Sequence, residues 1–107
     1  MHFRRRYRHM LAFVRMDGAY SMSLDTSLRK AMTAAAYGQP TGHIEAGVDL
    51  KLAIATEGNR INLPGGLPVI IDGQIAGAIG VGSGTGAQDL EVARAAIAVI
   101  DGAQSFD

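Results

Sequence analysis

Two apolar runs joined by Asp72-Gly73 constrain this chain more than any other feature of its sequence. An Asp-Gly pair favours a two-residue turn in which both residues have positive φ, and such a turn joins antiparallel neighbours. The flanking runs, LPVII and QIAGAIGV, have the length and the β-branched content of strands. We therefore expect a β-hairpin centred on this dipeptide.

A glycine-rich motif, Gly82–Ala87, follows the hairpin with the spacing G-x-G-x-x-A. In dinucleotide-binding proteins this spacing works only within a βαβ unit, whose second parallel strand carries an acid for the ribose. The helix predicted here reaches roughly Ile100, and too few residues follow it for such a strand. Thr85 and Gln88 instead fit a capping box, in which each side chain bonds the other's backbone N–H. We expect a capped helix rather than a phosphate site.

Two helices are indicated by apolar residues at helical spacing. In the first, these residues are Leu24, Leu28, Met32 and Ala35; in the second, they are Leu90, Ala93, Ile97 and Ile100. Ser23 is expected to cap the first helix, and Gly38 and then Pro40 to end it. Gly102 is expected to end the second helix, which begins near Gln88.

The remaining segments have weaker patterns. Met10–Met16 contains β-compatible residues and ends at the turn-forming pair Asp17-Gly18, so we expect a strand. Thr41–Glu57 favours one or two short helices, broken near Gly47 and stopped at Gly58. Helices around an antiparallel sheet make an α+β domain. With three strands the sheet has a long open edge, which either a partner chain covers or missing sequence would complete.

Composition narrows the function classes. Ten basic and ten acidic residues give a formal net charge of zero, which argues against a general nucleic-acid binder. Arg4, Arg5, Arg6 and Arg8 crowd the start, so we expect residues 1–8 to form a basic, irregular segment and residues 9–107 to form the domain. The chain has no cysteine, and no apolar run approaches the roughly 20 residues of a membrane span. We expect a cytoplasmic protein without a nucleic-acid or membrane partner.

Five blocks in one order make the chain resemble the GlcG/HbpS-like family, which includes haem-binding HbpS and the C-terminal domain of PduO-type corrinoid adenosyltransferases. The blocks are Arg15-Met16-Asp17-Gly18-Ala19; Ser27 with Lys30-Ala31 and Thr33-Ala34; Leu63-Pro64-Gly65-Gly66 with Pro68; Asp72-Gly73 with Gly77-Ala78-Ile79-Gly80-Val81; and Gln88-Asp89. The resemblance implies a profilin-like antiparallel sheet flanked by helices, assembled into homo-oligomers such as dimers or octamers.

Family members begin with a long amphipathic helix and a strand before the segment that corresponds to Met10–Met16, and residues 1–8 are unlike that region. We therefore expect an N-terminally shortened member, arising by truncation, a misplaced start or a frameshift. A specialised short form is the alternative.

Several polar residues are candidates for binding a ligand. Arg15, at the end of the expected strand, could clamp a carboxylate through its planar guanidinium, or pair internally with Asp17 or Asp89. Lys30 and Thr33 share one helix face, and the family pattern implies that both lie near the pocket, where they could meet an acidic ligand or a haem propionate. A solvated helix face is the alternative.

Other candidates come from the loops and the last helix. Gly65 and Gly66 would let a ligand approach backbone N–H groups, or simply form a tight loop. Asp89 is a candidate for ligand binding or proton transfer, although a carboxylate in the first turn also stabilises a helix. The histidines lack metal-ligand spacing, so we expect no metal site, and His43 as an axial haem ligand is a minor hypothesis.

Two function hypotheses follow from the resemblance. The first is a non-catalytic protein that binds haem, a related tetrapyrrole or another acidic small molecule, with haem as its possible cofactor. The second is a cofactor-independent enzyme or accessory factor in the catabolism of a small organic acid, with Lys30 or Asp89 transferring a proton. A truncated, inactive family member is a third possibility.

Overall fold

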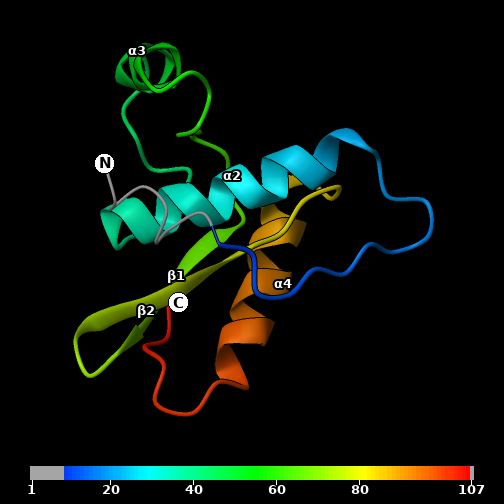
Figure 1. Ribbon diagram of the computed structural model, residues 1–107, viewed down its shortest axis with the longest axis vertical. Coiled ribbons are helices and arrows are strands. Elements are labelled where there is room, and N and C mark those ends of the chain that lie inside the picture. Colours follow the sequence, from blue (N-terminus) through cyan, green and yellow to red (C-terminus); the bar gives the residue numbers. More distant parts are fainter. Residues whose placement is uncertain (1–8, 107) are drawn as a thin grey trace.

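The computed structural model describes residues 9–106 of the chain. Its elements, in chain order, are α2 (Met22–Tyr37), α3 (Val48–Ala55), β1 (Gly66–Ile71), β2 (Gln74–Gly80) and α4 (Gly86–Ala98) (Figure 1). This arrangement is the α+β class that the sequence predicts. The basic segment predicted at residues 1–8 lies outside the described residues.

The predicted hairpin is confirmed. Asp72 and Gly73 have φ values of 52° and 75°, so both central residues adopt the left-handed conformation that a two-residue hairpin turn requires. β1 and β2 pair antiparallel, and the register is irregular between Val69 and Ile70.

The two long helices pack on opposite faces of the hairpin. Leu67 and Val69 of β1 form the buried core cluster with Ala93 and Ile97 of α4. On the other face, Gly80 of β2 lies so close to α2 that an added Cβ would overlap the Ser27 carbonyl oxygen. Side chains alternate between the two faces of a strand, so each helix covers one face.

The two edges of the hairpin differ. Residues after α4 cover the outer edge of β1 through an Ile71–Ala103 bridge and a hydrogen bond from Gln104 N–H to the Ile70 carbonyl, with an N–O distance of 2.8 Å. No strand among residues 9–106 pairs with the outer edge of β2. The open edge expected from the sequence is therefore that of β2.

The strand predicted at Met10–Met16 is wrong, because these residues run as irregular chain beside the sheet. Strand preference reflects how well a side chain fits a half-buried, pleated surface. Leu11 and Val14 are 96% and 86% exposed, so the described chain offers them no such surface.

Two of the four predicted helix ends are confirmed. The predicted end of the last helix at Gly102 is wrong, because α4 ends at Ala98 with Val99 as its C-cap. Gly38 ends α2 in the left-handed conformation, and Thr85 and Gln88 form the capping box at the start of α4. The predicted cap Ser23 is wrong, because α2 starts at Met22 and the Ser23 hydroxyl donates a hydrogen bond to the Tyr20 carbonyl.

Residues 42–62, which we call the arm, lie between α2 and β1 and extend away from the rest of the fold (Figure 1). They carry one short helix, α3, which follows Gly47 and ends before Gly58, as expected; both glycines have positive φ. The Asn62 side chain closes the arm at its base. It accepts a hydrogen bond from the Ile44 N–H and donates one to the Ile44 carbonyl. The Asn62 amide and the backbone N–H groups of Leu50 and Gly47 lower the pKa of Asp49.

None of the helices among residues 9–106 is long and apolar enough to cross a membrane.

The close approach of β2 to α2 predicts unequal effects of one substitution at two glycines. Gly80→Ala should lower the free energy of unfolding by about 1–3 kcal/mol, because its new methyl group meets the backbone of Ser27. Gly77→Ala in the same strand is the control, because a Cβ at Gly77 meets no atom within 4 Å. Urea unfolding of both variants checks this; equal stabilities would contradict the packing.

Candidate functional site

Lys30 and Asp89 form a buried ion pair between α2 and α4. The Lys30 Nζ lies 2.9 Å from the Asp89 Oδ2 and donates a second hydrogen bond, of 2.7 Å, to the Val81 carbonyl. The other carboxylate oxygen of Asp89 accepts from the Gly84 N–H. Both residues are 4% exposed, so solvent has little access to either charge. The pair therefore ties together two helices and the end of β2.

Gly65 and Gly66 pack directly against this ion pair. A Cβ at Gly65 would lie 3.1 Å from the Lys30 Nζ and 2.8 Å from the Asp89 Cβ, and one at Gly66 would lie 2.5 Å from the Lys30 carbonyl oxygen. The Gly66 N–H is already bonded to the Thr41 hydroxyl. Four of the six predicted site residues thus gather in one buried cluster, which we call the polar cluster: Lys30, Gly65, Gly66 and Asp89.

Thr33, the fifth predicted residue, anchors the return of the arm. Its hydroxyl donates to the Arg29 carbonyl and accepts from the Ile61 N–H at 3.0 Å. Thr33 and Lys30 are both buried, so the alternative of a solvated helix face is wrong.

Arg15 lies apart from these residues, on the exposed segment before α2. Its guanidinium donates to the Ala19 carbonyl at 3.3 Å. Asp89 is paired with Lys30 instead, and no ion pair between Arg15 and Asp17 forms among the described residues. His43 is exposed at the base of the arm. The roles of these residues toward a ligand stay predictions.

The glycine-rich motif before α4 uses its backbone donors internally. Three backbone N–H groups donate to side chains close by in the sequence. Gly84 donates to the Asp89 carboxylate, Thr85 to the Gln88 side-chain oxygen, and Gln88 to the Thr85 hydroxyl. In the described fold β2 is antiparallel to its neighbour β1, unlike the strand of a dinucleotide-binding unit. The capped helix is therefore the correct interpretation of this motif.

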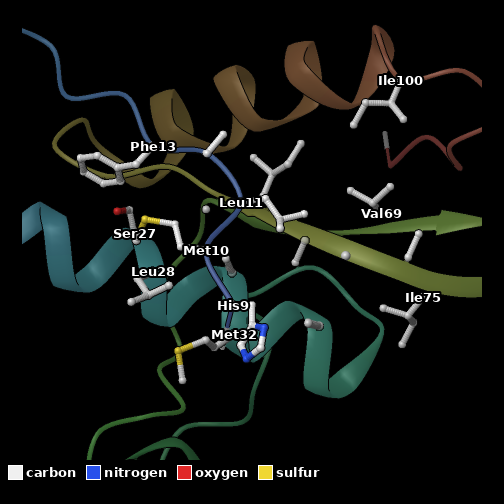
Figure 2. Close-up of a pocket in the computed structure, with 18 residues that line it drawn as sticks. His9, Met10, Leu11, Phe13, Ser27, Leu28, Met32, Val69, Ile75 and Ile100 are labelled. Carbon is white, nitrogen blue, oxygen red and sulfur yellow. The ribbon is translucent and has the colours of Figure 1, made fainter. Parts of the chain in front are cut away.

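A cleft of about 880 Å³ runs along the open edge of β2 (Figure 2). The irregular segment 9–13 crosses one side of it, α2 forms another wall, and Ile100 lies at its far end. The labelled side chains that line it are His9, Met10, Leu11, Phe13, Ser27, Leu28, Met32, Val69, Ile75 and Ile100. Nearly all are apolar, so the cleft suits a largely hydrophobic ligand.

None of the six predicted site residues lines this cleft. The sequence patterns did not indicate this cleft, because it depends on the path of residues 9–13, most of which fall in the segment Met10–Met16 that was predicted to form a strand. One signal was present: an apolar segment next to a sheet with an open edge leaves hydrophobic surface uncovered. Among residues 9–106, no cluster of three or more metal-ligating His, Asp or Glu side chains occurs.

The geometry defines a small α+β domain with a buried ion pair at its centre and an apolar cleft beside its sheet. Residues 2–98 match the protein family described as haem degrading protein HbpS-like, and the chain belongs to this family.

Similar proteins occur in several bacteria. A 15.0 kDa protein of the dhaT-dhaS intergenic region of Citrobacter freundii is 41% identical over 92 residues, covering 81% of this chain and 65% of that protein. Protein GlcG of Escherichia coli K12 is 44% identical over 74 residues, covering 68% of this chain and 55% of GlcG. The chain therefore spans less than two thirds of the length of either relative.

Solved structures share the fold. The crystal structure of a PduOC:Heme complex superposes with a TM-score of 0.78 at 27% identity, covering 88% of this chain and 71% of that chain. Protein ORFY of Klebsiella pneumoniae superposes with a TM-score of 0.77 at 35% identity, covering 85% and 68%. A crystal structure of HbpS has a TM-score of 0.69 at 32% identity, covering 81% and 62%.

The buried ion pair predicts a compensating double substitution. Lys30→Met should cost about 3–5 kcal/mol of unfolding free energy, because it leaves the Asp89 carboxylate buried without its cation. The double variant Lys30→Met/Asp89→Leu removes both charges and should recover most of this loss. Thermal and urea unfolding of the three proteins measure the effect. A double variant as unstable as Lys30→Met would refute the coupling.

Proposed function

We propose that this chain binds a flat tetrapyrrole such as haem, or a related acidic small molecule, in the cleft beside β2. The cleft itself carries the proposal, because its volume of about 880 Å³ lies within the range of small-molecule sites and its walls are mostly apolar. A tetrapyrrole ring is a large hydrophobic plate, which such walls accommodate by burying apolar surface.

Two comparisons support this proposal. The family is described by its relation to haem, and one structural neighbour was crystallised as a haem complex. These statements concern the family and that protein; for this chain, haem remains the proposed ligand.

The cleft contains side chains of the kinds that bind haem iron. His9 lines it together with the thioethers of Met10 and Met32 (Figure 2). Imidazole and thioether are the usual neutral axial ligands of haem iron, and bound haem would supply an iron centre able to accept them. His43 does not line the cleft, so we assign the candidate imidazole to His9 instead.

Arg15 is the candidate partner for the acidic groups of the ligand. It follows the cleft-lining Phe13 by two residues, on the same exposed segment, and its guanidinium bonds only one backbone carbonyl among the described residues. A guanidinium binds a carboxylate through paired hydrogen bonds. We assign Arg15 to a propionate, and we assign the polar cluster to holding α2 and α4 in place around the sheet.

A titration with haem tests the site. The purified protein should show a saturable change in the haem Soret band at micromolar haem. Ala78→Asp should weaken binding by at least about tenfold, because it places a carboxylate on the cleft wall, where it is poorly solvated and repels the propionates. Ala87→Asp is the matched control, because Ala87 is exposed on α4 outside the cleft. Absence of a saturable change in the parent protein would eliminate haem.

The roles of His9 and Arg15 can be separated by spectroscopy. His9→Ala should change the absorption and electron paramagnetic resonance spectra of bound ferric haem, because the iron loses an imidazole. Arg15→Ala should weaken binding about tenfold and leave these spectra unchanged, since it removes a propionate partner only. Iron-free protoporphyrin is the control, and its affinity should not depend on His9. Haem spectra that are identical in the parent and His9→Ala would exclude this histidine as a ligand.

A further inference from the structure

Charge is divided unevenly along this chain, although its formal sum is zero. Residues 1–16 contain five arginines and no aspartate or glutamate. Residues 17–107 therefore hold the other five basic residues and all ten acidic ones, a net charge of −5. An anionic partner is attracted to the first part and repelled by the second. Four of the five arginines, which we call the arginine cluster, are close together: Arg4, Arg5, Arg6 and Arg8.

The segment that follows the arginine cluster exposes apolar side chains. Fifteen large hydrophobic residues are exposed among residues 9–106, and seven of them lie between positions 10 and 22. Three of these seven, Met10, Leu11 and Phe13, line the cleft beside β2. The other four do not line the cleft and are 71–86% exposed, and we call them the apolar rim: Val14, Met16, Tyr20 and Met22.

The apolar rim lies on the loop before α2 and on the first residue of that helix. A backbone hydrogen bond of 3.1 Å from the Ala19 N–H to the Met16 carbonyl closes the turn of this loop. The Tyr20 N–H donates to the Ser83 hydroxyl at 3.3 Å, which attaches the loop to the chain before α4. Figure 1 shows the loop projecting beyond the start of α2. The rim is therefore presented at the N-terminal end of this helix.

We propose that this end of the chain binds the surface of an anionic lipid bilayer. The arginine cluster binds the lipid headgroups, and the apolar rim enters the boundary between the headgroups and the acyl chains. Electrostatic attraction and buried apolar area each strengthen such peripheral binding. Residues 17–107 have a net negative charge, so the same surface repels them and the body of the protein faces away from the bilayer.

Other anionic partners use only part of this surface. A nucleic acid attracts arginines through its phosphates but leaves the apolar rim in water. An acidic protein segment offers carboxylates without a hydrocarbon layer. A bilayer offers an anionic plane and an apolar interior together, which matches an arginine cluster followed by exposed apolar side chains. Asp17 is the single acidic residue among residues 1–22, so it is outnumbered by the five arginines.

This inference replaces the sequence expectation of a chain without a membrane partner. That expectation rested on the zero net charge and on the lack of an apolar run long enough to span a bilayer. A peripheral contact requires neither a basic chain as a whole nor a spanning helix, because a local basic cluster and nearby apolar side chains are sufficient.

Co-sedimentation with lipid vesicles tests the charge requirement. The parent protein should bind phosphatidylcholine vesicles that contain about one third phosphatidylserine, and about 0.5 M salt should release it. Arg4→Gln/Arg5→Gln should weaken this binding about thirtyfold, because each arginine contributes roughly a fivefold factor near an anionic surface. Lys51→Gln/Arg94→Gln is the matched control, because it removes two exposed positive charges from α3 and α4. Its binding should equal that of the parent.

Fluorescence tests the insertion of the apolar rim. The chain contains no tryptophan, so one introduced indole is its sole reporter of this kind. The emission of Tyr20→Trp should shift to shorter wavelength with anionic vesicles, because the ring leaves water. Val99→Trp is the control, because Val99 is 82% exposed at the far end of α4, and its emission should not shift.

Three results would overturn the inference. Absence of binding to anionic vesicles at low salt, or equal binding to neutral and anionic vesicles, would refute the charge requirement. Binding of a DNA duplex without binding of anionic vesicles would assign the arginines to nucleic acid. Bound Tyr20→Trp with an unchanged emission would refute insertion. Haem binding by Tyr20→Trp should match that of the parent, because Tyr20 does not line the cleft, so the two proposals fail independently.

Discussion

The buried ion pair between Lys30 and Asp89 is the interaction on which the rest of this small structure depends. The helices α2 and α4 do not pack on each other, because the hairpin lies between them. Lys30 donates hydrogen bonds to the carbonyl of Val81, the residue that follows β2, and to the carboxylate of Asp89 in the first turn of α4. A buried charge is tolerated only when paired and hydrogen-bonded. The positions of both helices relative to the sheet are therefore coupled to one pair of side chains.

Glycine makes this arrangement sterically possible. Gly65 lets the loop before β1 lie against the ion pair, and Gly80 lets β2 approach the backbone of α2. A domain with few aromatic residues builds its core from small side chains, and close backbone approach replaces the volume that larger residues would fill. The glycines of the Gly82–Ala87 motif also make close contacts, Gly84 with Asp89 and Gly86 with Pro64.

Besides the apolar rim, two apolar surfaces of the described chain remain uncovered after the core is formed. The cleft beside β2 is apolar and carries one imidazole, properties that suit a tetrapyrrole. The arm presents α3, an apolar helix that packs on no other helix or strand among residues 9–106.

The sequence alone determined the hairpin, the C-terminal end of α2, the capped start of α4 and the α+β class, because each follows from local chemistry: positive φ at Asp72 and Gly73, a left-handed Gly38, and a Thr85–Gln88 pair three residues apart. Five short sequence blocks that resemble those of the HbpS-like family identified the family. Only the tertiary structure decided that Lys30 pairs with Asp89, 59 positions away, that Arg15 lies apart from both, and that residues 10–16 form no strand. These outcomes depend on which surfaces meet across the chain, and local patterns contain no information about distant partners.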